Sequence, residues 1–207
     1  MNPHRFLSAS VAAATLLAAC GTVSLDETDH DALFVGARVE KRLSGTAVHD
    51  GTHLEAEWRM ADGETEALDY SIETLALGFG VDRTVGEHGW IGAVGGLAWQ
   101  GADFDTTPDE LEDLNGVGPY FALQAGWLAT PWFEPYARAG GSLYFPEFGN
   151  ELSVEAGARF HAFEHASLFV GWRYASYEFG DFDPNALGVD TLELDTSGLV
   201  VMLQLGF

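Results

Sequence analysis

The sequence has little of three things: cysteine, basic residues and long apolar runs. Cys20 is the only cysteine among 207 residues, so the chain cannot form an intramolecular disulfide. Nine Lys and Arg residues stand against 32 Asp and Glu, which gives a formal net charge of −23. Because a phosphate backbone needs a basic face, this balance excludes nucleic acid as a partner. Beyond the N-terminal segment no apolar run reaches the roughly 18 residues of a transmembrane helix, so helical membrane spans are excluded too.

The first residues are typical of a targeting segment. A short polar start leads into the apolar stretch 6–19, which ends at Leu17-Ala-Ala-Cys20. We therefore expect residues 1–19 to be a signal peptide. Leu-Ala-Ala-Cys resembles the lipobox of bacterial lipoproteins, which implies acylation of Cys20; the alternative is an ordinary signal peptide whose cleavage site happens to include a cysteine. Residues 20–31 are polar and acidic, and we expect them to form a periplasmic tether.

From residue 32 onward, apolar side chains alternate with polar or small ones. A period of two indicates β-strands with two different faces. Glycine (25 residues) and aromatic residues (13%) are abundant, which suits a closed barrel built from strands that each give a weak signal. The sequence predicts an all-β fold over residues 32–207, an eight-stranded antiparallel transmembrane up-and-down β-barrel. Its eight strands are expected near residues 32–43, 66–81, 89–100, 118–129, 134–145, 151–162, 167–179 and 192–207.

The last of these segments has the clearest pattern. Its apolar parity ends in Leu203, Leu205 and Phe207, while Gln204 lies on the mixed face. About nine to eleven residues suffice for a tilted strand to cross a bilayer. A strand of this kind that ends on an aromatic residue resembles the closing strand of small bacterial outer-membrane barrels of the OmpA/OmpX type. The resemblance implies that Phe207 belongs to the signal read by the barrel assembly machinery, and that outer-membrane lipid and lipopolysaccharide surround the barrel.

The lengths of the connections favour an outer-membrane orientation. Links after the second, fourth and sixth segments are short, and those after the first, third and seventh are long. Short periplasmic turns, long outer loops and an even strand number, with both termini in the periplasm, are typical of these barrels. The short link 146–150 breaks the rule once. Residues 52–60 also alternate; as a strand they would make nine and separate the termini, so we interpret them as a hairpin arm within the long first loop, 44–65.

The positions of the arginines distinguish a membrane barrel from a soluble one. An arginine that faces lipid near the midplane costs about 2–4 kcal/mol, yet five arginines lie on the parity opposite the apolar residues. We expect them to face inward and to fill the narrow lumen of the barrel. A lipocalin-like soluble barrel, the alternative, would place the apolar set inside. The predicted lumen network comprises Arg38, Glu40, Arg42, Gln124, Arg138, Glu155, Arg159 and Arg173.

The sharpest catalytic candidate is the pair His165 and Ser167, with Glu178 on the same segment. Such residues can serve as base, nucleophile and orienting group in ester hydrolysis. The His-x-Ser pair resembles that of outer-membrane lipid A deacylases, although Leu168 stands where those enzymes carry a polar residue. A continuous strand would separate Ser167 from Glu178 by roughly 36 Å. We therefore expect a turn histidine followed by a strand serine, and no catalytic site.

Metal binding is the remaining chemistry that the acidic segments suggest. Residues 103–113 are rich in carboxylates, but Pro108 and Leu114 stand where an EF-hand needs glycine and a bidentate glutamate. His161 and His165 come closest to a ligand pair, without a shared helical face. We expect no metal site in the protein and no cofactor, with divalent cations possible only at the acidic outer loops.

The function predicted from these observations is that of a non-enzymatic outer-membrane protein with a plugged polar lumen and acidic surface loops. Its role would lie in envelope structure or surface interaction. A lipid-modifying enzyme and a narrow channel are the two alternatives.

Overall fold

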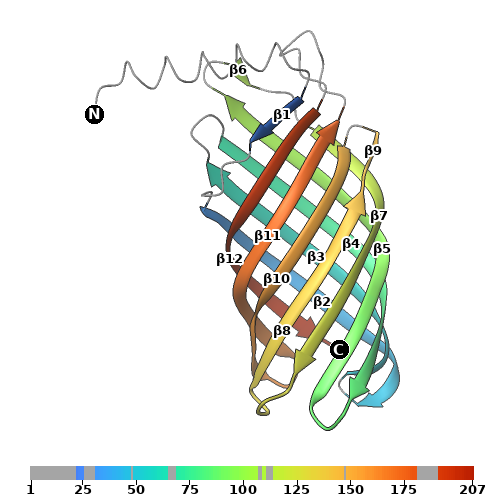
Figure 1. Cartoon of the computed structure of the whole chain (residues 1–207). Helices are drawn as coiled ribbons and strands as arrows, with labels where there is room; N and C mark the ends of the chain where they lie inside the picture. Colours follow the sequence, from blue (N-terminus) through green and yellow to red (C-terminus); the bar gives the residue numbers. More distant parts are fainter. Residues whose placement is uncertain are drawn as a thin grey trace, which may run out of the picture.

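The strands of this chain close into a β-barrel (Figure 1). The computed structural model describes residues 22–25, 31–47, 49–64, 69–106, 109–110, 114–146, 148–180 and 191–207. Within these ranges there is no helix that could cross a membrane. The predicted signal peptide 1–19 and Cys20 lie outside the described residues.

Nine long strands make the barrel wall: β2 (Asp31–Ala47), β3 (Asp50–Glu64), β4 (Asp69–Val85), β5 (Gly89–Thr106), β7 (Leu114–Trp127), β8 (Phe133–Leu143), β10 (Phe148–Phe163), β11 (Ala166–Gly180) and β12 (Thr191–Gly206). Each pairs antiparallel with the next, and β12 pairs with β2 to close the ring. Three short strands extend one end: β1 (Thr22–Leu25) pairs with β12, β6 (Asp109–Glu110) with β5, and β9 (Phe145–Pro146) with β7.

The prediction of eight strands is wrong by one, because residues 50–64 form a full strand of the wall. β3 pairs with β2 from Leu33↔Asp62 to Ala47↔Asp50, and along its other edge with β4. The hairpin arm expected at 52–60 and the long loop expected at 44–65 are therefore both wrong. The alternation of residues 54–60 was a true strand signal, and the expectation of an even strand number overrode it.

Closure of a nine-stranded ring requires one parallel pair. β12 and β2 run in the same direction and pair from Ser197↔Asp31 to Gly206↔Glu40, which confirms that the last strand pairs with the first predicted segment. A parallel ladder also satisfies the backbone groups of both strands, so an odd ring leaves no open edge. The expectation that the barrel begins and ends at the same end is wrong: Phe207 lies at the end opposite to the beginning of β2 (Figure 1).

The two ends of the barrel differ in their connections. At the end that holds Phe207, which we call the turn end, short links join β2 to β3, β4 to β5, β7 to β8 and β10 to β11. The other end, which we call the loop end, holds the remaining connections and the short strands β1, β6 and β9 (Figure 1).

The outer face of the wall carries an apolar band without charged side chains at mid-height. On β4, for example, Leu75, Leu77, Phe79 and Val81 all point outward and are exposed. Most outward carboxylates of the described strands gather toward the loop end, at Asp62, Glu64, Asp69, Glu73, Asp103, Glu178, Glu193 and Asp195, whereas Asp50 is exposed at the turn end. The two outward cations of the described strands, Lys41 and Arg83, lie toward the turn end.

Glycines on the inner face make room for large lumen side chains. A Cβ at Gly78 would collide with the Tyr120 hydroxyl, and one at Gly80 with the His53 ring. Small residues on β4 thus allow bulky polar side chains from β3 and β7 to cross a narrow lumen.

Candidate functional site in the barrel lumen

Five buried arginines and five buried glutamates fill the lumen, and Asp82 is a further buried carboxylate at its turn-end side. The ten arginines and glutamates come from the inner faces of β2, β3, β8, β10 and β11, and the most exposed of them, Arg138, is only 8% exposed. A buried charge is costly unless it is paired and hydrogen-bonded, so such an interior needs nearly equal numbers of positive and negative side chains. The ten residues are Arg38, Glu55, Glu57, Arg59, Glu134, Arg138, Glu151, Glu155, Arg159 and Arg173.

Arg38 lies at the centre of this cluster and is fully buried. Its Nε and Nη2 donate to one oxygen of Glu57, at 3.0 and 2.8 Å. Its Nη1 donates to the Tyr136 hydroxyl at 3.0 Å, and Nη2 reaches Glu155 at 3.4 Å. Because Glu57 is on β3 and Glu155 on β10, one guanidinium group bridges distant parts of the wall.

Arg59 and Arg173 continue the bridging on the loop-end side of Arg38. Both donate to Glu151 Oε1, at 3.1 and 2.6 Å respectively. Arg59 also donates to Glu57 at 2.7 Å, and Arg173 to Glu155 at 3.0 Å. These contacts close a ring of alternating charge, which we call the ionic ring: Arg38, Glu57, Arg59, Glu151, Arg173 and Glu155.

Arg138 and Glu55 form a bidentate pair attached to this ring. Nη1 and Nη2 of Arg138 donate to the two oxygens of Glu55, at 3.2 and 2.9 Å. Arg38 Nε lies 3.7 Å from Glu55, and Arg138 Nη2 lies 3.6 Å from Glu57. Eight charges therefore form one connected network across the lumen.

Aromatic and aliphatic side chains fill the lumen between the ionic ring and the loop end. Phe104 and Phe179 pack edge to face with ring centroids 5.1 Å apart. Their neighbours in this layer include side chains with less than 2% exposure: Phe34, Ile72, Tyr144, Tyr177 and Leu194. Two layers of side chains therefore block the lumen: the charged network in the middle and the apolar layer toward the loop end.

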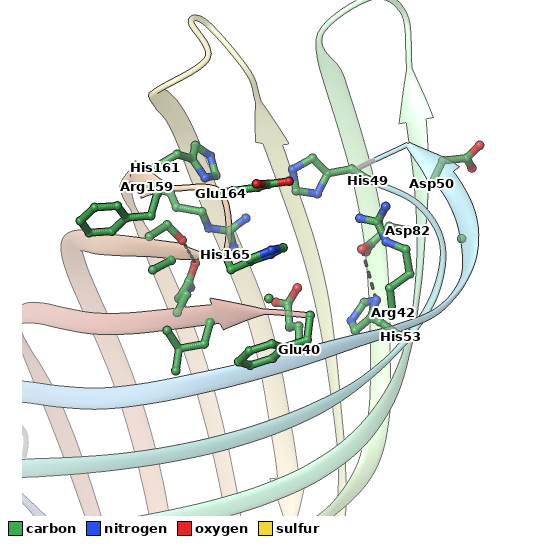
Figure 2. Close-up of a pocket in the computed structure, with 18 of the residues that line it drawn as sticks. Glu40, Arg42, His49, Asp50, His53, Asp82, Arg159, His161, Glu164 and His165 are labelled. Atoms are coloured by element: carbon green, nitrogen blue, oxygen red, sulfur yellow. Dashed lines mark hydrogen bonds and ion pairs between the residues drawn. The ribbon is translucent and has the colours of Figure 1, made fainter.

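A vestibule of about 370 Å³ opens on the turn-end side of the network (Figure 2). Four histidines line it, His49, His53, His161 and His165, together with carboxylates that include Glu40 and Glu164. Nδ1 of His53 lies 3.3 Å from an oxygen of Asp82.

Glu134 holds the inner wall of the vestibule together. One of its oxygens accepts from Trp90 Nε1 at 3.1 Å and from Arg159 Nη1 at 3.0 Å. The other lies 3.0 Å from His161 Nε2 and 3.3 Å from His49 Nε2. This carboxylate is completely buried, so these four partners must stabilise its negative charge in place of water.

The structure places six of the eight predicted network residues in the buried lumen. Five of the six belong to the charged cluster, and the sixth, Gln124, donates to Asp82 and accepts from Tyr136. Glu40 and Arg42 line the vestibule instead, at the turn end of β2. Five members of the charged cluster were not predicted from the sequence: Glu55, Glu57, Arg59, Glu134 and Glu151. The first three lie on the strand taken for a hairpin arm; the other two share the parity of predicted members on β8 and β10.

The structure does not bring the catalytic candidates together. His165 stacks on the Phe207 ring, and the Ser167 hydroxyl donates to Gln204 Oε1 at 3.5 Å, both at the turn end. Glu178 lies toward the other end of β11 on the outward parity, where it accepts from Asn150. A base and a nucleophile without an orienting acid do not make a catalytic triad.

Among the residues that the structure describes, no three His, Cys, Asp or Glu side chains could hold a metal ion. Comparison with known proteins gives no match, whether to family models, to curated proteins or to solved structures.

Proposed function

We propose that this protein is a non-enzymatic outer-membrane barrel with a plugged lumen, and that it acts in envelope structure or surface interaction. The observation that carries the proposal is the inverted distribution of its side chains. Ten arginines and glutamates lie buried inside the barrel, whereas large hydrophobic residues cover its outside, for example Leu97 at 61% exposure. A water-soluble barrel would have the opposite arrangement, because it must bury its apolar side chains.

The height of the apolar band supports membrane embedding. On β4 the band lies between the outward Glu73 and the outward Arg83. The residues between them span roughly 23 Å along the barrel axis for a rise of about 3.3 Å and a tilt of about 40°. Outer-membrane barrels have an apolar band about 25 Å tall.

The two rims support one orientation. The short links and the aromatic side chains Trp127, Trp132 and Phe163 lie at the turn end, which we assign to the periplasm. The acidic loop end would then face outward, where divalent cations can bridge its carboxylates to lipopolysaccharide phosphates. The start of β2 and the end of β12 lie at opposite ends of the barrel. Phe207 therefore lies on the proposed periplasmic side, and the start of β2 lies on the other side.

The plugged lumen argues against the channel alternative and gives a direct test. We expect the purified protein to fractionate with outer membranes, to show a heat-modifiable folded band on a gel, and to give no stepwise conductance in planar bilayers. A soluble protein without a folded band would contradict the barrel assignment in the membrane. Discrete conductance steps in the unmodified protein would contradict the plugged state.

The enzyme alternative has its own test. Because Ser167 and Glu178 lie toward opposite ends of β11, we expect Ser167→Ala to leave the lipid A species of the membrane unchanged, as judged by mass spectrometry. Glu178→Gln serves as the matched control. A loss of a deacylated species with Ser167→Ala would favour a lipid-modifying enzyme.

A further inference from the structure

The outer wall is not uniform, because a groove interrupts the apolar band across β4, β5, β7, β8 and β10. The groove encloses about 620 Å³. Its floor includes the small outward residues Ala125, Ala137 and Ala139, of which Ala125 pairs with Ala137 across β7 and β8. Large side chains such as Val81, Ile91 and Val154 line it as well. Such a shape accommodates an extended hydrocarbon chain.

Arg83 stands at the turn-end side of this groove. It is exposed, it lines the groove, and it pairs with Ile91 across β4 and β5. Among the described residues no hydrogen-bond or ion-pair partner of its guanidinium group is found. Planar guanidinium groups bind phosphate in a bidentate manner. An unpaired arginine beside an apolar groove has the chemistry of a lipid-phosphate site.

We infer that this groove and Arg83 bind one glycerophospholipid, with an acyl chain along the alanines and the phosphate on Arg83. Surrounding lipid is as apolar as the groove, so the chain gains packing there rather than hydrophobic free energy. Selectivity must then come from the phosphate contact. The inference rests on the proposed membrane embedding, and it assigns the lipid to the leaflet at the turn end.

Charge supports a phosphate-bearing ligand on this side of the barrel. Most outward carboxylates of the described strands lie toward the other end, so they repel an anionic headgroup less where Arg83 lies. Asp50, exposed at the first position of β3, is the exception at the turn end. Lys41, the other outward cation of the described strands, is on β2 and does not line the groove. Lys41 therefore provides a matched control, because it is also a cation on the outer face of the barrel wall.

The test measures binding of dipalmitoyl phosphatidylglycerol to the detergent-solubilised, folded barrel by native mass spectrometry. We expect Arg83→Gln to weaken binding about fivefold, the effect of about 1 kcal/mol for one cation near a lipid surface. Lys41→Gln should leave the affinity unchanged. Ala139→Phe, which fills the groove, should weaken binding to a similar degree, whereas Ala56→Phe on the outer face of β3 should not.

Each possible result has a defined meaning. Equal binding by the Arg83→Gln and Lys41→Gln variants would overturn the lipid site, as would stronger binding of purified lipid A than of phosphatidylglycerol to the unmodified protein. A heat-modifiable folded band in every variant shows that the barrel is intact. Loss of that band in the unmodified protein would instead overturn the membrane proposal, so the two failures are distinguishable.

Discussion

Arg38→Met is expected to lower the free energy of unfolding of the barrel by about 3–5 kcal/mol, the usual cost of removing one partner from buried ion pairs. The methionine fills much of the same volume, so the loss is mainly electrostatic. Glu57 would lose the two hydrogen bonds that it accepts from Arg38, at 3.0 and 2.8 Å, and Glu155 would lose its link across the lumen. Urea unfolding in lipid vesicles, followed by tryptophan fluorescence or by the folded gel band, measures the change.

The controls separate lost charge balance from lost packing. Arg83→Met removes a cation from the outer face and should change stability by less than about 0.5 kcal/mol. The double variant Arg38→Met with Glu57→Gln restores equal numbers of buried arginines and glutamates in the lumen. It should be more stable than Arg38→Met alone. A cost below about 1 kcal/mol for Arg38→Met would mean that water, rather than the ionic ring, occupies the middle of the lumen.

Leu77→Arg is expected to cost about 2–4 kcal/mol of stability in a bilayer, because it places a guanidinium group at the middle of the apolar band. Leu77 is 60% exposed and points outward from β4, so the larger side chain meets no steric obstacle within the barrel. The same substitution on a water-exposed surface would be nearly neutral. The measurement is urea unfolding in vesicles of the two proteins side by side.

Asn115→Arg is the matched control for this substitution. Asn115 also points outward, but from the loop-end part of β7, where the band has ended. We expect a cost of about 0–1 kcal/mol there, as near a membrane interface. Equal and small effects at both positions would show that the outer face is in water, which would contradict membrane embedding.

The lumen residues show how far the sequence could be interpreted without the structure. The inward direction of Arg38, Arg138 and Arg173 follows from their parity against apolar neighbours, and this is a local property of each strand. Which carboxylate each arginine meets is not local. Arg38 meets Glu57 through the β2–β3 register and Glu155 across the barrel, over a sequence separation of 117.

Glu55 and Glu57 were not predicted as lumen residues, although the pattern of their strand is also local. Glu55 and Glu57 alternate with outward residues, as Glu155 does on β10. They were excluded because nine strands would have placed the termini at opposite ends. That exclusion relied on a regularity of known barrels. An odd number of strands carries no cost in unpaired backbone groups, because β2 and β12 pair in parallel and leave no open edge.

The sequence by itself determined which segments alternate and which side chains share a face, because a period of two requires only that neighbouring side chains point in opposite directions. It also determined that charge lies on the face opposite the large apolar residues. The tertiary structure decided the number of strands, the parallel seam, the ionic ring, the vestibule and the groove beside Arg83. Each of these depends on which strands become neighbours and in which register, and long-range pairing across the ring sets both.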